Sequence, residues 1–259
     1  ALVLATGLQL AGALTCLLAQ RGRAVAEAAL PGSDPGEWIE TWLSEPRFAP
    51  YLIESGGDRQ RALETYEWNA RLAAAVMRDI AHVEVAVRNA FDKVMRERWE
   101  GTQHWLLDPT SPVLAQLWRT RRGNRVDLNA RNRMNVAEAV RRCGGRSAQP
   151  DQVIAEPSFG FWRHCTDTAH EKTLWVPFLH RAWPSKTNRV TIERALTTIN
   201  SVRNRASHHE PLFPPQPGRD VHAAHHEVLR LADLLIPELA EHLRRTSAVP
   251  AALKGRPGQ

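Results

Sequence analysis

The sequence predicts an all-α protein. Apolar residues recur at intervals of three or four along most of the chain, whereas no segment shows a convincing strand-like alternation. A stretch of 43 residues, 58–100, contains neither Gly nor Pro. Hydrophobic residues make up 43% of the 259 residues and charged residues 24%, a balance that excludes wholesale disorder. We therefore expect a bundle of long antiparallel helices with shorter helices inserted.

The stretch 58–100 is expected to form one very long helix, or two with a small break, with Asp58 as its N-cap and Gly101 as its stop. The last helix is expected from Arg219 or Asp220 to about Arg245, and Pro237 can kink it. Shorter helices are expected between these two, at 112–118, 133–143, 168–182 and 185–209. The remaining segments, 144–157 and 246–259, are expected to be loops.

Residues 1–19 are almost all apolar or small, and a bilayer crossing needs about 20 such residues. No basic residue precedes this run, so we expect an extension and no stable membrane association. The alternative is a signal anchor, which would make the protein a membrane-anchored effector. The segment 31–36, PGSDPG, is typical of a linker. The expected organisation is an N-terminal extension with its linker (1–37), a helical domain (38–245) and a C-terminal tail (246–259).

Positive charge is concentrated in one stretch. The chain has a net charge of +6, and nine arginines but only two acidic residues lie between Leu117 and Arg146. Such a stretch suits contact with a polyanion such as RNA. A solvated loop of the same composition is an equally good interpretation. The candidate RNA-binding residues are Arg121, Arg122, Arg125, Arg131 and Arg133.

Common catalytic motifs are missing. The chain has no GxxxxGK phosphate loop, no GxGxxG after a strand, no GxSxG elbow and no HExxH pair. Its three cysteines lie far apart, which argues against a disulfide framework and favours a reducing compartment, the cytoplasm. His222 and His226 are four residues apart without an obvious third ligand, so no metal or other cofactor is expected.

The most informative segment is NSVRNRASHHEPLF, residues 200–213. Asn204 and His208 are four residues apart and share a helix face, and the long side chain of Arg203 can reach the same cleft. An imidazole with a pKa of about 6.5 can take a proton from a hydroxyl at neutral pH. A guanidinium can hold two phosphate oxygens. On spacing alone, an ordinary helix end, where the dipole favours His and Arg, is the better explanation.

The sequence RNRASHH (203–209) resembles the Arg-Asn-x-x-x-His form of the R-x4–6-H motif of the HEPN superfamily. Within that superfamily, the chain is similar to the Abi-like (abortive infection) bacterial family over roughly residues 38–245. Further blocks agree in order: LSEPRFAPYL (43–52), ALETYEWNARL (62–72), HVEVAVRNAFD (82–92), FGFWRH (159–164) and TLWVPFLHRAWP (173–184). The triplet RAS at 205–207 departs from the more apolar family form.

The resemblance implies an α-helical HEPN bundle that forms a homodimer, with paired motifs facing each other. It implies an endoribonuclease that works without a metal and leaves 2′,3′-cyclic phosphate ends, in phage defence or as a toxin-like growth-arrest effector with an antitoxin or defence partner. Carried onto this chain, His208 is the acid/base group and Arg203 binds the scissile phosphate. Asn204 orients one of them, and His209 supports them or contacts RNA.

Glu84 and Arg88 form an i,i+4 pair among valines, so we expect both to turn inward. Glu84 would then either fix Arg203 or His208, or lock two helices together with Arg88. The alternative to a nuclease is a non-catalytic helical module that binds RNA or a protein through the 117–146 stretch.

Overall fold

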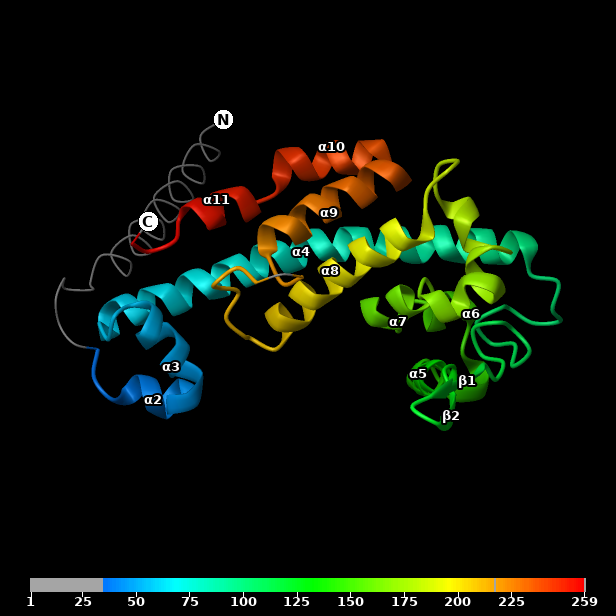
Figure 1. Cartoon of the computed structure of the whole chain (residues 1–259), viewed down its shortest axis with the longest axis horizontal. Helices are drawn as coiled ribbons and strands as arrows, with labels where there is room; N and C mark the ends of the chain where they lie inside the picture. Colours follow the sequence, from blue (N-terminus) through cyan, green and yellow to red (C-terminus); the bar gives the residue numbers. More distant parts are fainter. Residues whose placement is uncertain (1–34, 217, 259) are drawn as a thin grey trace, which may run out of the picture. The chain divides into compact units, whose positions relative to one another are not determined.

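The computed structural model describes residues 35–216 and 218–258, so the expectations for residues 1–34 lie outside the described part. Helices dominate it, which confirms the all-α fold class (Figure 1). The chain divides into two compact units, Ala1–Thr65 and Tyr66–Gln259. The candidate functional residues all belong to the second unit.

The first unit contains α2 (Trp38–Leu43), α3 (Glu45–Glu54) and the beginning of α4 (Arg59–Arg98). Its core consists of buried side chains including Ile39, Phe48 and Tyr51. Arg59 forms an ion pair with Glu40, with 2.5 Å between Nη1 and Oε1. These contacts join the short helices to the first turn of α4.

The helix α4 runs without interruption over 40 residues, so the expectation of one long helix is confirmed. Asp58 caps it, since its Oδ1 accepts a hydrogen bond of 3.0 Å from the N–H of Arg61. Val76, Ile80, Val83, Val87 and Phe91 form its buried face, at the intervals of three and four residues read from the sequence.

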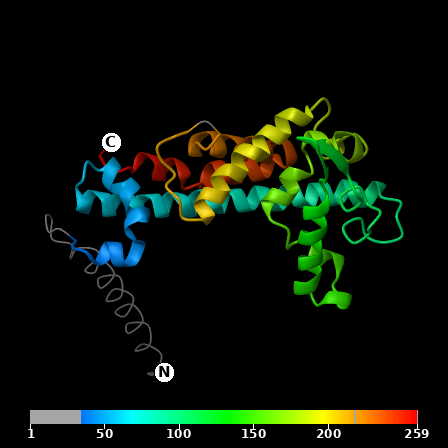
Figure 2. The same ribbon diagram turned by 60° about the horizontal axis from the view of Figure 1, so that its bottom comes forward.

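In the second unit, α8 (Arg189–Ser207) packs against α9 (Val221–Leu235), and α9 packs against α10 (Pro237–Thr246). Figures 1 and 2 both show α8 and α9 alongside the part of α4 that belongs to this unit. The expected single helix over 220–245 is two helices, because Ile236 takes an extended conformation before Pro237. The expected C-terminal loop contains α11 (Val249–Lys254).

The segment between α4 and α8 differs most from expectation. The helix expected at 112–118 is absent, and an antiparallel hairpin of β1 (Trp118–Arg121) and β2 (Asn124–Asp127) follows instead. Arg122 and Gly123, the two turn residues, both have positive φ (49° and 79°), which matches the twist that a two-residue hairpin turn requires. In the sequence, the hairpin is therefore indicated by its two turn residues and not by the pattern of its short strands.

The helix expected at 133–143 is confirmed as α5 (Ala130–Arg142), which ends before Gly144 at φ 97°. The expected loop 144–157 contains the 3-10 turn η1 (Gly145–Ser147) and α6 (Pro150–Val153), and α7 (Phe159–His164) follows. The regular helix expected over 168–182 is wrong. Short 3-10 and π turns replace it, because Pro177 has no backbone N–H to donate to a continuous helix. These turns are η2 (Thr168–His170), η3 (Glu171–Trp175) and η4 (Leu179–Ala182).

Among the helices that the structure describes, none combines the length and the apolar character that crossing a membrane requires.

Candidate functional site

The candidate motif occupies the C-terminal end of α8. Asn188 caps the start of the helix, because its side chain accepts a hydrogen bond of 2.8 Å from the N–H of Val190. It ends after Ser207, where the N–H of His208 donates to the carbonyl of Asn204 at 3.0 Å. His209 follows with a φ of 56°, a left-handed conformation that stops the helix. The motif therefore comprises the last helical turn and the turn that ends it.

Buried Asn69 of α4 holds the chain that leaves this turn. Its Oδ1 accepts a hydrogen bond of 2.7 Å from the N–H of Leu212, and its Nδ2 donates to the carbonyl of Glu210 at 3.3 Å. Arg205 donates to the carbonyl of Pro211 and lies 3.6 Å from Glu210, between Nε and Oε2. Arg205, within the triplet that departs from the family form, thus stabilises the exit of the chain from α8.

The side chain of Arg203 turns toward α4. Its Nε is buried and has no hydrogen-bond partner among the described residues. Burial raises the pKa of Glu84 on α4, and the positive charges of Arg203 and then of Arg88 oppose this effect, with the backbone amide of Phe159. The charges of Arg203 and Arg88 therefore both act on Glu84, no hydrogen bond or ion pair joins Glu84 to Arg203 in the described part of the chain, and both expected roles of Glu84 stay predictions.

Arg88 is half-buried and donates a hydrogen bond of 3.3 Å from Nε to Oδ1 of Asn89. Its charge still acts on Glu84. The two residues turn inward only in part, because Glu84 is also half-buried rather than enclosed.

The remaining motif residues face outward. Asn204, His208 and His209 are exposed, and their side chains make no hydrogen bond or ion pair with any residue in the described part of the chain. The imidazole of His208 is therefore accessible to a ligand.

A cleft of about 880 Å³ lies beside α8. It is lined by residues of β2, α5, α7, α8 and the segment after α7. Asn204 and Asn200 contribute from α8, and Arg131 contributes from α5, whereas Arg203 and His208 are not among its lining residues. One motif residue and one candidate RNA-binding arginine therefore meet at this cleft.

The other candidate RNA-binding arginines have different surroundings. Arg133 is half-buried, forms an ion pair with Asp127 and donates a hydrogen bond of 2.9 Å to the carbonyl of Leu114. Arg122 and Arg125 are exposed on the hairpin, and the guanidinium of Arg125 lies 4.6 Å from the ring centroid of Trp118. Arg121 pairs with Asn124 in the ladder. The internal contacts of Arg133 give it a structural role.

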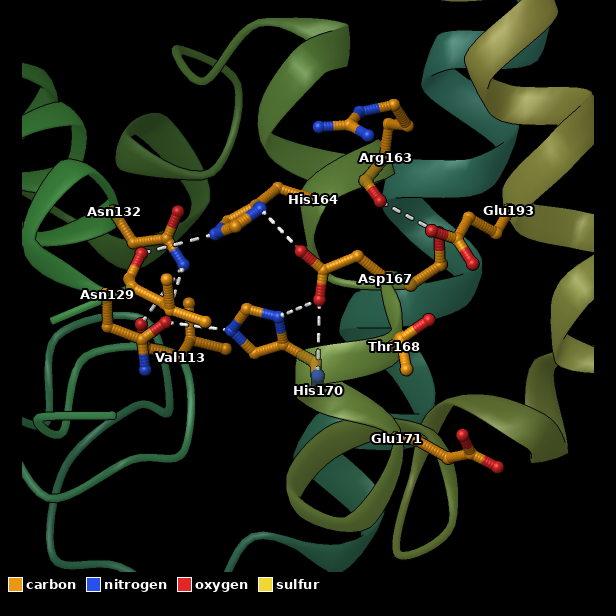
Figure 3. Close-up of polar contacts among 12 residues, drawn as sticks. Val113, Asn129, Asn132, Arg163, His164, Asp167, Thr168, His170, Glu171 and Glu193 are labelled. Atoms are coloured by element: carbon orange, nitrogen blue, oxygen red, sulfur yellow. Dashed lines mark hydrogen bonds and ion pairs between the residues drawn. The ribbon is translucent and has the colours of Figure 1, made fainter. Parts of the chain in front are cut away.

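A second polar group on the cleft wall was not found from the sequence. His164, Asp167 and His170 bring ligand-type atoms within 4.8 Å of one another (Figure 3). Burial raises the pKa of Asp167, but the hydrogen bonds from His164 and then His170 outweigh it, so the pKa lies well below its usual range. The signal in the sequence was the spacing His-x2-Asp-x2-His.

The histidines of α9 have separate surroundings. His222 and His226 are exposed, whereas His225 is half-buried, with its Nε2 3.0 Å from Oγ of Ser247 and 3.6 Å from Oδ2 of Asp79. Burial lowers the pKa of His225. Among the described residues, this triplet does not form a group of three metal ligands.

Comparisons with protein-family models, with curated proteins and with solved structures each find no match for this chain.

Proposed function

We propose that the chain is an endoribonuclease whose reacting groups are Arg203 and His208. The observation that carries the proposal is the difference in burial between Arg203 and His208 at the end of α8. Arg203 is half-buried and its charge acts on Glu84, whereas His208, five residues later, is exposed and has no partner among the described residues. A half-buried guanidinium and an accessible imidazole at the same helix end suit phosphodiester chemistry.

The chemistry needs no metal ion. His208 takes the proton of a ribose 2′-hydroxyl, and the 2′-oxygen attacks the adjacent phosphorus. The bond from phosphorus to the 5′-oxygen breaks, and that oxygen takes up a proton from water as it leaves, after which His208 gives its proton back to water. The products are a 2′,3′-cyclic phosphate and a 5′-hydroxyl. Arg203 would stabilise the charge that builds on the phosphate oxygens, and Glu84 would keep its guanidinium in place.

Two further features support an RNA substrate. Asn204 and Arg131 line the same cleft, and Arg122 and Arg125 are exposed on the hairpin. The resemblance to the Abi-like family adds the expectation of a homodimer with paired motifs. It also adds growth arrest in phage defence or in a toxin–antitoxin setting.

The test is cleavage of RNA by the wild type and by His208→Ala. The substitution should lower the rate by about 10²–10⁴-fold, the usual contribution of a general acid/base. The fold should survive, since His208 is exposed. His226→Ala, which removes another exposed histidine, is the matched control and should cleave like the wild type. Equal rates for wild type and His208→Ala would refute the proposal.

The second candidate function is a non-catalytic RNA-binding module. The exposed hairpin favours it, because Arg125 stacked on Trp118 presents a cation and an aromatic ring together. This function predicts binding by a wild type that does not cleave, and binding that survives His208→Ala. Charge reversal at Arg121, Arg122 and Arg125 should then abolish most of the affinity.

A further inference from the structure

Three side chains converge on one point of the cleft wall. His164 is the last residue of α7, and His170 is the last residue of the turn η2. The Nδ1 of His170 lies 2.7 Å from Oδ1 of Asp167, and the Nδ1 of His164 lies 3.0 Å from Oδ2 of the same carboxylate. Figure 3 shows the two rings on the same side of Asp167, each pointing at one of its carboxylate oxygens. The two histidines thus use the same ring nitrogen toward the same group.

The ring nitrogen of His170 that faces away from Asp167, Nε2, must be a hydrogen-bond donor. This nitrogen lies 2.8 Å from Oδ1 of Asn129. The amide of Asn129 can only have its oxygen there, because its Nδ2 donates to the carbonyls of Pro112 at 3.0 Å and Ala115 at 2.8 Å. An amide oxygen only accepts, so the proton is on Nε2 of His170.

His164 has the same arrangement. Its Nε2 lies 3.3 Å from the carbonyl oxygen of Leu128, which is also only an acceptor. A neutral imidazole carries one N–H. In both rings that N–H is on Nε2, where it donates to Asn129 or to the carbonyl of Leu128. Both Nδ1 lone pairs would then face the Asp167 carboxylate, an arrangement that needs a cation between them.

Either two protons or one metal ion can supply that positive charge. Two protons would make both imidazoles cationic, with their ring centroids 4.7 Å apart and His170 fully buried, so the two like charges would oppose each other. One divalent ion satisfies both lone pairs and the carboxylate at once. The outer contacts also match a general feature of metal sites, in which a ligating histidine donates its other N–H to a fixed acceptor.

We propose that His164, Asp167 and His170 bind a divalent transition-metal ion such as Zn²⁺, through both Nδ1 atoms and a carboxylate oxygen. The donor set of two imidazoles and one carboxylate suits zinc. Tetrahedral ligands about 2.0–2.1 Å from zinc lie about 3.3 Å apart. The spacings of 2.7 Å to Oδ1 and 3.0 Å to Oδ2 of Asp167 must lengthen slightly to reach that value, and all the ligand atoms lie within 4.8 Å of one another.

The ion would be accessible from the cleft. His164 and Asp167 are among the residues that line it, whereas His170 is buried behind them. Three protein ligands leave a fourth position for water or another ligand, as in open zinc sites. The site is separate from the proposed nuclease residues, because neither Arg203 nor His208 contributes a ligand.

Metal binding to the full chain tests the inference. Tag-free protein is stripped with a chelator and titrated with Zn²⁺ by calorimetry, and with Co²⁺ as a spectroscopic probe. We expect one ion per chain and the visible absorption bands of tetrahedral Co²⁺. His164→Ala should weaken binding at least about 10–100-fold, since even the loss of an outer-shell partner has that effect.

Asp167→Asn is the second variant, because it keeps the size of the side chain while removing the charged ligand, and it should also weaken binding. Circular dichroism verifies that both variants are folded. The double variant with His222→Ala and His226→Ala is the matched control and should bind like the wild type. Absence of stoichiometric binding by the wild type, or unchanged binding by folded His164→Ala, would overturn the proposal and leave a proton-held network. RNA cleavage by the chelator-treated protein is measured separately and bears only on the proposed nuclease.

Discussion

Two sides of the same cleft differ in how their polar side chains are satisfied. On α8, Asn204 lines the cleft and its side chain has no partner among the described residues, like that of the neighbouring His208. After α7, where His164 and Asp167 line the cleft, both ring nitrogens of His164 and of His170 and both carboxylate oxygens of Asp167 have partners. The polar side chains at the end of α8 are thus free to bind a ligand, whereas those of the cluster after α7 already have hydrogen-bond partners within the protein.

This difference separates two ways in which a polar cluster can act. Unpartnered groups can form their hydrogen bonds with a ligand at no cost in lost internal bonds. Partnered groups in a buried setting stabilise the fold, and a ligand can only join them by taking the place of something already there, such as a proton. Substitutions on the two sides should therefore affect different measurements.

The largest expected effect is on stability, on the partnered side. His170→Ala would leave Oδ1 of Asn129 and Oδ1 of Asp167 without their imidazole partner in a buried site. We expect the free energy of unfolding of the metal-free chain to fall by about 3 kcal/mol, as when one member of a buried pair is removed. Urea unfolding measures it, with His180→Ala, an exposed histidine bonded to the carbonyl of Trp175, as the control. A loss no larger than that of the control would contradict the comparison.

The next effect is on activity, on the unpartnered side. Arg203→Ala should lower RNA cleavage by about 100-fold, the order expected for loss of one group that stabilises transition-state charge. Its stability should change little, because its Nε makes no hydrogen bond to be lost. Arg194→Ala, an exposed arginine of the same helix, is the control and should leave the rate unchanged. A large stability loss with normal cleavage would assign Arg203 to the fold instead.

The same contrast explains what the sequence could predict. The long helix α4 was predictable, because 40 residues without Gly or Pro repeat an apolar face that must be buried. The motif on α8 was predictable, because its residues are close neighbours in the sequence, in the last helical turn and the turn that ends it.

The cluster around Asp167 was not predictable in the same way. Its outer acceptors, Leu128 and Asn129, lie about forty residues earlier in the chain, and only tertiary packing brings them to His164 and His170. The segment 168–182 also lacks a regular period, since its backbone alternates between 3-10 and π turns. The local periodicity of a sequence predicts a helix with a repeated apolar face, but it does not predict hydrogen bonds between residues far apart in the chain.

A smaller effect should distinguish two neighbouring arginines of α5. Arg131 is exposed and lines the cleft, whereas Arg133 is paired with Asp127. Arg131→Ala should reduce the slope of log affinity for RNA against log salt by about 1. Arg133→Ala should leave that slope unchanged and instead lower the stability. Filter binding over a salt series and urea unfolding provide the two measurements, and equal slopes for both variants would remove Arg131 from the RNA-binding surface.

The smallest effect concerns the pH dependence of stability through Glu84. Its pKa in the folded chain lies above the ordinary value of 4.5, because burial outweighs the attraction of Arg203 and Arg88. The folded state therefore holds this proton more tightly than the unfolded state, and the wild type loses stability as the pH rises from about 4.5 through the folded pKa. Glu84→Gln has no such proton, so its stability relative to the wild type should increase over that window and stay constant above it.

Urea unfolding from pH 4 to 8 measures the difference, with Glu97→Gln as a control for the loss of an exposed charge on α4. A relative stability that falls with rising pH would mean that the arginines outweigh burial, and Glu84 would then be a committed ion-pair partner like Asp167.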